Sequence, residues 1–226
     1  MDKNRQAVRI NDSFTRGFEK KWLPRMANAL PERVTPDHMT LIGILAAFIV
    51  AAGYLMSGLS PWWLMLSNFG LVLHWYGDSL DGTLARVRKC ERERYGYFVD
   101  HVCDIGTVVL IAISMGASPL MQMEIALFVA VGYSMMNVYV HIVAYTRQKF
   151  LLSHGKIGPT EFRIILIMIN MVIILWNPVI FTWNDELYRV LDAAGIAIAV
   201  MLFSTFIFKS INGAKQLNDL DTGKSD

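Results

Sequence analysis

The sequence predicts an all-α integral membrane protein with six transmembrane helices and an N-terminal amphipathic interfacial helix. Three observations predict this class. Hydrophobic residues make up 54% of the 226 residues, and only 18% are charged. The apolar residues lie in long runs, and a run of about 18 or more mostly uncharged residues is long enough to cross a bilayer. The lysines and arginines gather on one side of these runs, as they do in membrane proteins.

The N-terminal part, residues 1–37, is polar and basic. Within it, residues 14–31 place Phe14, Phe18, Trp22 and Met26 roughly on one side of a helix. This pattern is typical of an amphipathic helix lying on a membrane surface. No apolar segment follows the charged N-terminus directly, so we expect no cleavable signal peptide.

Six apolar segments follow and form the second part, residues 38–209. The predicted helices span residues 38–57, 61–80, 96–115, 120–145, 160–181 and 187–209. Pro61, Pro119 and Pro159 fall at or just before the start of a segment, where proline is tolerated. The third part, residues 210–226, is a polar tail, and we expect its end, LNDLDTGKSD, to be disordered.

The distribution of positive charge tests this topology, because six helices leave both chain ends on the same side. Of the 21 lysines and arginines, 20 lie in the N-terminal part, the tail, or around the second-to-third and fourth-to-fifth connections. Only Arg189 lies on the opposite side. The basic side is the cytoplasmic side by the positive-inside rule. We therefore expect a multi-pass protein of the inner or plasma membrane in a prokaryote, or of the endoplasmic reticulum in a eukaryote.

Four aspartates lie at or inside the second and third predicted helices. Asp78 and Asp81 are three residues apart, and Asp100 and Asp104 are four apart. Both spacings put the side chains on one helix face. The short connection, residues 87–95, makes the two helices antiparallel neighbours, so the two pairs can face each other at a similar depth.

Carboxylates in a membrane need a positive partner, because each one costs about 2.5–3.5 kcal/mol to insert. Hard divalent cations with oxygen ligands are the natural answer, and two Mg²⁺ ions would neutralise all four charges. Pairing with the basic residues of the connecting loop is the alternative, although Asp104 lies too deep for it. The pattern predicts a metal site at the cytoplasmic ends of the two helices.

Small residues share the faces of these aspartates. Gly82 and Ala85 stand four residues after Asp78 and Asp81, and Gly96 stands four before Asp100. Such residues leave room for a ligand against the backbone, although each one alone is more often explained by helix packing. With divalent metals and the nearby Arg86, they favour a phosphate or diphosphate ligand and phosphoryl-type transfer.

The segment DSLDGTLARVRKCERERYGYFVDHVCD, residues 78–104, resembles the signature of the CDP-alcohol phosphotransferase family. That signature reads D-x-x-D-G-x-x-A-R and, after a spacer, G-x-x-x-D-x-x-x-D. All eight fixed positions are present, and the spacer has nine residues where eight is commonest. The segment TPDHMTLIG, residues 35–43, resembles the family's P-N-x-x-T entry to the first helix, with Asp37 in place of asparagine.

The resemblance implies a reaction in which an alcohol attacks one phosphorus of a CDP-linked donor and CMP leaves. It implies that the four aspartates hold two Mg²⁺ ions, with Mn²⁺ as the alternative, and that Asp104 is a candidate base. It also implies a donor site made of Asp78, Asp81, Gly82, Ala85, Arg86, Gly96 and Thr40. A homodimer is expected only because homodimers are common in that family, and no nucleic-acid partner is expected.

Two further segments resemble the choline/ethanolamine phosphotransferase branch. VDHVCD, residues 99–104, is similar to that branch's D-H-G-C-D, and GPTEF, residues 158–162, is similar to its G-P-x-E-G. Val102 and Phe162 replace glycines of these patterns. This likeness implies that His101 and Glu161 activate a lipid hydroxyl, with transfer from CDP-ethanolamine or CDP-choline to a lipid alcohol such as diacylglycerol. A satisfied core histidine and a carboxylate near a helix N-terminus are the alternatives.

Other functions stay open at this point. A CDP-diacylglycerol-dependent enzyme would act on a soluble alcohol such as inositol phosphate or glycerol phosphate, and Arg147 and Arg163 are then candidates for binding the acceptor. Together with Lys149 and Lys156 these residues are equally explained by positive-inside charge. A membrane prenyltransferase would need other motifs. A divalent-cation transporter would need carboxylates near the bilayer midplane, whereas Asp78 lies at a helix end.

Overall fold

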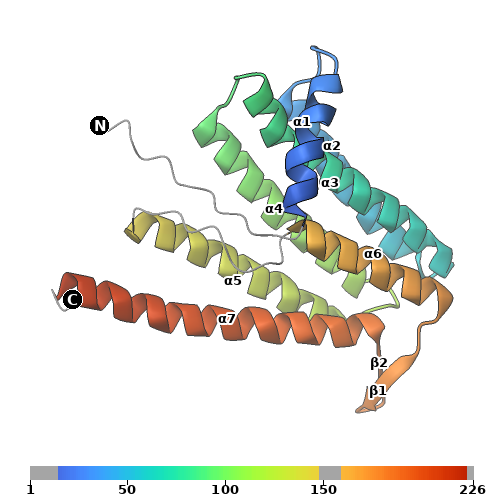
Figure 1. Ribbon diagram of the computed structural model, residues 1–226. Helices are drawn as coiled ribbons and strands as arrows, with labels where there is room; N and C mark the ends of the chain where they lie inside the picture. Colours follow the sequence, from blue (N-terminus) through green and yellow to red (C-terminus); the bar gives the residue numbers. More distant parts are fainter. Residues whose placement is uncertain (1–14, 148–158, 223–226) are drawn as a thin grey trace.

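The computed structural model describes residues 15–147 and 159–222 (Figure 1). The described elements are α1 (Arg16–Ala29), α2 (Pro36–Met56), the 3-10 helix η1 (Pro61–Trp63), α3 (Leu64–Val87), α4 (Glu93–Gly116), α5 (Met123–Arg147), α6 (Pro159–Leu175), β1 (Val179–Trp183), β2 (Glu186–Arg189) and α7 (Val190–Asp221). The protein is therefore mainly helical, as predicted.

Among the described residues, four helices are long and apolar enough to cross a membrane, which makes this an integral membrane protein. They are Pro36–Met56, Glu93–Gly116, Met123–Val143 and Val190–Asp221. A helix also stands at each of the other two predicted segments. However, α3 carries Asn68, His74 and Asp78, and α6 has only 17 residues. The count of six spans remains a prediction.

The predicted helix over residues 160–181 is wrong at its C-terminal end, because α6 stops at Leu175 and a β-hairpin follows. Pro178 disfavours helix in the residue before it. Asn184 and Asp185 form the two-residue turn, with φ values of 49° and 65°. Asparagine and aspartate tolerate positive φ better than most residues, and tight hairpin turns require it. This hairpin and the start of α7 lie at the lower right of Figure 1.

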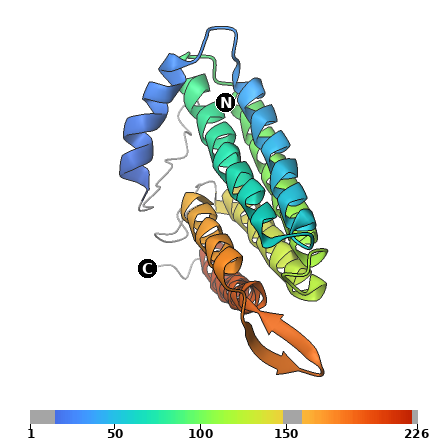
Figure 2. The same cartoon turned by 90° about the vertical axis from the view of Figure 1, so that its right-hand side faces the viewer.

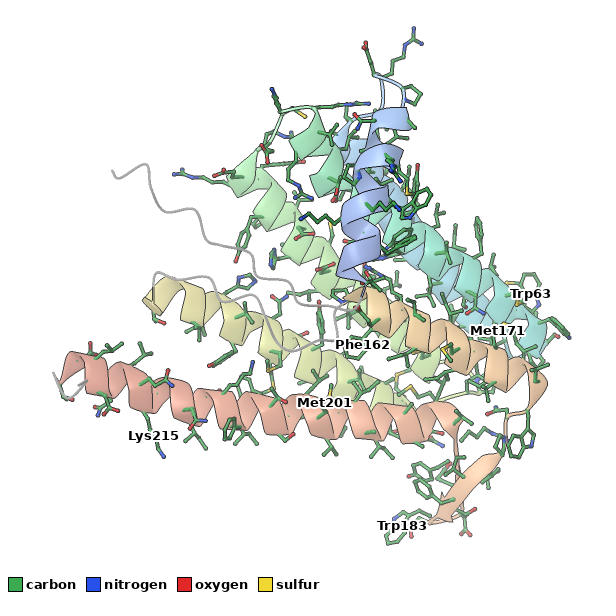
Figure 3. The ribbon with its side chains drawn as sticks, in the orientation of Figure 1. Trp63, Phe162, Met171, Trp183, Met201 and Lys215 are labelled. Carbon is green, nitrogen blue, oxygen red and sulfur yellow. The ribbon has the colours of Figure 1, made fainter. Side chains whose placement is uncertain are left out.

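The last helix continues beyond the predicted end at residue 209. The tail that we expected to be disordered is helical up to Asp221. Near this point α7 is held by α5, since the Tyr139 hydroxyl donates a 3.0 Å hydrogen bond to the Lys209 carbonyl. The helix formers that follow Gly213, such as Ala214, carry it onward. In Figure 3, Lys215 on α7 lies at one end of the molecule, and Trp63 and Trp183 lie toward the other.

The helix α1 is present and has two different sides. Leu23 and Ala27 are buried, whereas Phe18 and Trp22 are exposed. Figure 2 shows this helix along one side of the bundle, next to α3. Its position on a membrane surface remains a prediction, and Phe14 lies outside the described residues.

Arg88, just after α3, fixes the connection between α1 and α2. Its guanidinium donates hydrogen bonds to four backbone carbonyls of that connection, those of Leu30, Pro31, Glu32 and Val34. Such carbonyls lie at the end of a helix and in an irregular segment, where regular backbone pairing does not satisfy all acceptors.

The helices α2 and α3 form the tightest pair in the fold. A Cβ atom on Gly77 would lie 2.5 Å from the Gly43 nitrogen, and one on Gly70 would lie 2.8 Å from the Val50 nitrogen. Small residues allow this close approach of membrane helices. Ser67 adds a 3.0 Å hydrogen bond from its hydroxyl to the Val50 carbonyl. The backbone around Asp78 is therefore held against α2.

A buried polar network fastens α6 to this pair. The Tyr54 hydroxyl on α2 donates to Asn170 Oδ1 at 2.9 Å, and Asn170 Nδ2 on α6 donates to Asn68 Oδ1 on α3 at 2.8 Å. All three side chains are buried. The network fixes α6 beside α3, the helix that carries Asp78.

Candidate active site

Three aspartates from α3 and α4 meet at one point. Asp78, Asp100 and Asp104 each have one carboxylate oxygen that lies within 4.8 Å of such an oxygen on the other two residues. The connection between the helices is short, and Lys89 within it adopts a positive φ of 54°. The i, i+4 spacing of Asp100 and Asp104 then aims both toward α3. The structure therefore brings together three of the four predicted metal ligands.

Asp81 has a different environment from these three. Its Oδ2 accepts a 2.9 Å hydrogen bond from the Thr40 hydroxyl of α2, and its Oδ1 accepts one from the Gly82 backbone. Asp81 and Thr40 still line the same pocket as the other aspartates. Two residues that the sequence placed in one donor site, Thr40 and Asp81, are thus in direct contact.

The pocket lies between α2, α3 and α4. Its lining residues are Thr40, Gly43, Ile44, His74, Asp78, Asp81, Asp100, Cys103, Asp104 and Thr107. Sequence reasoning did not assign Gly43, Ile44, His74, Cys103 or Thr107 to this set. Cys103 and Thr107 follow Asp100 and Asp104 by three residues, so helical spacing alone would have found them.

A cation that contacts the carboxylates comes from α6. Arg163 Nη2 lies 2.6 Å from Asp78 Oδ2, and both side chains are largely buried. Two arginines of the connection after α3 have other partners. Arg88 binds carbonyls, and Arg92 forms an ion pair with Asp37. The side chain of Arg147 is not described, and Lys149 and Lys156 lie outside the described residues.

His101 stands beside the aspartates with a defined orientation. Its Nδ1 is 2.8 Å from the Tyr97 carbonyl and 3.7 Å from Asp100 Oδ2. A carbonyl only accepts, so Nδ1 carries the hydrogen, and in the neutral ring Nε2 is the basic nitrogen. This is the arrangement that a general base needs at Nε2.

Two residues that the sequence did not single out surround His101. The Tyr97 ring lies 4.3 Å and the His141 ring 4.7 Å from the His101 ring, centroid to centroid. Tyr97 Oη and His141 Nδ1 are 2.6 Å apart. The spacing of four residues from Tyr97 to His101 was the available signal. These contacts fix the ring of His101 between α4 and α5.

Glu161 has hydrogen bonds that run to the N-terminal end of α1. Its Oε1 accepts from the Thr15 backbone at 2.8 Å and from the Thr15 hydroxyl at 2.9 Å. The neighbouring Thr160 donates a 2.6 Å hydrogen bond to Glu19. These bonds join α6 to α1, and the pairing of Glu161 with His101 remains a prediction.

The small residues of the predicted donor site have open space around them. A Cβ atom on Gly96 would meet nothing within 4 Å, and one on Gly82 would meet only Arg86 Nη1, at 3.5 Å. Contacts within the described chain therefore do not require glycine at either position. Arg86 is exposed, and its Nη2 donates a 3.0 Å hydrogen bond to Thr83. The openness agrees with room for a ligand better than with helix packing.

The donor set suits a hard divalent cation. Mg²⁺ prefers carboxylate oxygens and water, and it commonly shares its coordination with substrate phosphates. The three clustered carboxylates offer such oxygens from two helices, with Asp81 close by in the same pocket. The site is thus a carboxylate-rich pocket inside a membrane protein, able to hold a metal ion and a phosphate-bearing ligand.

A family model places this site in a known class of enzyme. The model, described as CDP-alcohol phosphatidyltransferase, matches residues 33–208. This match covers most of the chain and every residue of the pocket, so the chain belongs to the CDP-alcohol phosphatidyltransferase family. The family predicted from residues 78–104 is confirmed, whereas the branch within it stays a prediction. No match was found among curated protein sequences.

Membership of this family establishes the general activity. The family transfers phosphate-containing groups, takes its group from a CDP-alcohol donor, acts on lipid substrates in a membrane and uses divalent metals.

Proposed function

We propose that this protein transfers a phospho-alcohol group from CDP-ethanolamine or CDP-choline to a lipid alcohol such as diacylglycerol, with release of CMP. The observation that carries the proposal is the meeting of Asp78, Asp100 and Asp104 beside an oriented His101. The carboxylates supply the metal site of the family reaction. The histidine supplies a base for a hydroxyl group.

In this proposal Asp78, Asp81, Asp100 and Asp104 hold two divalent cations, Mg²⁺ or alternatively Mn²⁺. Bound there, the cations would neutralise the negative charge of the donor diphosphate and of the leaving CMP. The protein itself contributes alignment of the donor against the acceptor, which is a large part of catalysis when two substrates must meet.

The donor would lie between the helix ends of α3 and α4. Gly82 and Gly96 leave space beside the backbone, Ala85 is the third small residue there, and Arg86 offers an exposed guanidinium for a phosphate. Thr40 holds Asp81 from the α2 side. The donor site faces the cytoplasm in this proposal, because the positive side of the chain is the cytoplasmic one.

The acceptor hydroxyl would reach the site from the lipid. Phe98 and Val102, which flank His101 on α4, are exposed apolar side chains. His101 Nε2 takes the proton as the hydroxyl oxygen forms its bond to phosphorus, and the phosphorus–oxygen bond to CMP breaks. Asp104 is then mainly a metal ligand, and it is the alternative base. Glu161 remains a proposed partner of His101.

A second candidate uses CDP-diacylglycerol and a soluble, phosphate-bearing alcohol. Arg163 favours it, because this largely buried guanidinium lies at the carboxylate cluster and matches a phosphate in geometry and charge. Diacylglycerol has no charge that would need such a partner. Arg147, at the end of α5, is the other candidate for binding that phosphate.

A donor panel tests the proposal. Purified protein in lipid nanodiscs with Mg²⁺ is offered CDP-choline, CDP-ethanolamine or CDP-diacylglycerol with matching acceptors, and CMP and lipid product are measured. We expect product from CDP-choline or CDP-ethanolamine with diacylglycerol. Product from CDP-diacylglycerol alone would replace the first candidate by the second.

The His101→Gln variant tests the base. We expect its turnover to fall by roughly 10²–10⁴-fold if Nε2 accepts the proton. The matched control is His141→Gln, which changes the neighbouring ring of the same cluster and should retain most of the activity. Equal, small effects of both substitutions would show that His101 only packs.

A further inference from the structure

A histidine whose Nδ1 has no hydrogen-bond partner among the described residues lines the carboxylate pocket. His74 lies on α3, four residues before Asp78, and is only 6% exposed. Its Nδ1 is sealed from solvent and has no hydrogen-bond partner in the described part of the chain. Buried polar atoms are nearly always paired, so an unpaired one inside a pocket calls for an explanation.

The two ring nitrogens have different surroundings. Nδ1 is sealed from solvent, and since His74 nevertheless lines the pocket, we assign Nε2 to the pocket side of the ring. Among buried backbone groups, an N–H without an acceptor is rarer than a carbonyl with an unused lone pair, and we apply the same preference to the ring nitrogens. The hydrogen of the neutral ring therefore belongs on Nε2. The pocket thus receives an N–H donor in addition to its carboxylates, and a donor needs an acceptor atom on whatever binds there.

The place of His74 along α3 indicates which part of a bound nucleotide it would meet. With a rise of 1.5 Å per residue, His74 lies about 6 Å along the helix from Asp78 and about 12 Å from Gly82. The donor site of the proposed function puts the nucleoside near Gly82 and Arg86, at the cytoplasmic end. The opposite end of the pocket is then nearest the phosphate that is farther from the nucleoside.

We propose that His74 donates a hydrogen bond from Nε2 to an oxygen of the nucleoside-distal phosphate, the phosphate that is transferred. This inference rests on the proposed function. The role differs from those of the carboxylates, since His74 would recognise the phosphate oxygen directly through a neutral donor. The bond gives the ring one hydrogen-bond partner, at Nε2, whenever the donor is bound, and Nδ1 stays a buried acceptor.

Comparing the binding of CDP with that of CMP isolates this contact, because CDP has the distal phosphate and CMP lacks it. Binding of CDP and of CMP is measured by calorimetry in Mg²⁺ for the wild type, His74→Phe and His74→Gln. The Phe variant keeps an aromatic ring of similar size without the donor. The Gln variant keeps an N–H donor at a similar reach without the ring. Gel filtration and circular dichroism establish that each variant is folded.

We expect His74→Phe to weaken CDP binding about tenfold or more, as for loss of a hydrogen bond to a charged group, and to leave CMP binding within about twofold. His74→Gln should retain most of the preference for CDP. An unchanged CDP-to-CMP ratio in His74→Phe would overturn the inference. So would a Gln variant that loses the preference while the Phe variant keeps it, because that result means ring packing.

A third pattern tests the underlying function. If the folded wild type binds neither CDP nor CMP, the proposed function is wrong, and the inference fails with it. If the wild type binds both and the variants do not separate them, only the inference fails. Should His74→Phe not fold, His74→Leu removes the donor in its place, with the same expected ratio.

Discussion

The helices α3 and α4 each supply two of the predicted metal ligands, yet they are packed very differently. The buried residues of α3 run along its whole length, from Leu64 to Leu84. Those of α4 are Ala112, Ser114 and Met115, which all lie beyond its aspartates. No residue between Glu93 and Ile111 is fully buried. The helix α3 is embedded in the protein core along its length, whereas the part of α4 that carries the aspartates is not, although the clustered carboxylates of both helices are partly buried.

The glycines of the two helices show the same contrast. Gly77, next to Asp78, touches the backbone of α2, whereas a Cβ atom on Gly106, two residues after Asp104, would meet nothing within 4 Å. Since packing of small residues is a main source of helix association in membranes, α2 and α3 form a fixed frame. We therefore expect α3 to keep its place when ligands bind and α4 to adjust to them.

The largest effect is expected from the carboxylates themselves. Asp100→Asn removes one charge of the cluster and should lower Mg²⁺-dependent CMP release by about 10²–10³-fold, the usual loss for one electrostatic contact to a reacting group. Stability should hold, because this part of α4 is loosely packed. Activity is measured as CMP release from the preferred CDP-alcohol, and stability as thermal unfolding in detergent.

Asp192→Asn is the matched control. Asp192 is a buried carboxylate at the other end of the bundle that accepts backbone hydrogen bonds from Gln122 at 2.7 Å and Arg189 at 2.8 Å. We expect this change to lower stability by about 1–3 kcal/mol and to leave turnover per folded molecule unchanged. Normal CMP release by Asp100→Asn would contradict the metal-site assignment.

The next-largest effect is a loss of stability that tests how tightly α3 is packed compared with α4. Gly77→Ala puts a Cβ atom 2.5 Å from the Gly43 nitrogen and 2.6 Å from the Met39 carbonyl oxygen. Both neighbours are backbone, so the helices must separate, at a cost of about 1–3 kcal/mol. Activity should fall too, because Asp78 moves with α3. Unfolding temperature and CMP release of the same preparation check both effects.

Gly106→Ala is the matched change on α4. With nothing to contact, its methyl group should leave stability unchanged or raise it by about 0.5–1 kcal/mol, since alanine favours helix. The contrast between α3 and α4 fails if the two alanine substitutions cost the same. A Gly106→Ala variant that is more stable and fully active would support the looser packing of α4.

The sequence predicted the parts of the site that depend on local spacing. The pairs Asp78 with Asp81 and Asp100 with Asp104 needed only helix periodicity and a short connection to be placed near one another. The ion pair of Arg163 with Asp78 spans 85 residues and depends on how α6 packs against α3. The contact of Thr40 with Asp81 likewise needs the close approach at Gly77. Such long-range packing has no signal in residue spacing.

The fold shows a similar division. Long apolar runs predicted where helices lie. They did not predict where α6 ends, because Val179, Ile180 and Phe181 of the hairpin continue the apolar run. The turn at Asn184 and Asp185 was the local signal for that hairpin. The hydropathy pattern also ended the last helix too early. The contact of Tyr139 with Lys209 holds α7 at the last residue of the apolar segment, and helix-favouring residues extend the helix beyond it.

The smallest effects are expected from the polar contacts that join α3 to α6 and α4 to α5. Asn170→Leu breaks the fully buried link of α6 to α2 and α3 and leaves Tyr54 and Asn68 without partners. We expect a loss of about 1–2 kcal/mol. Tyr97→Phe breaks the half-buried contact with His141 that joins α4 to α5, and should cost only about 0.6 kcal/mol, the average for polar contacts between membrane helices.

The free energies of unfolding of both variants are measured in the same detergent. A double-mutant cycle of Tyr54→Phe with Asn170→Leu isolates the interaction energy between these two side chains. A larger loss for Tyr97→Phe would mean that α4 is held by its polar contacts as firmly as α3 is by packing. The ranking expected here, with the larger loss at Asn170, instead leaves α4 as the adaptable half of the site. His101 would then keep its orientation mainly through its own bond to the Tyr97 carbonyl, which the phenylalanine variant retains.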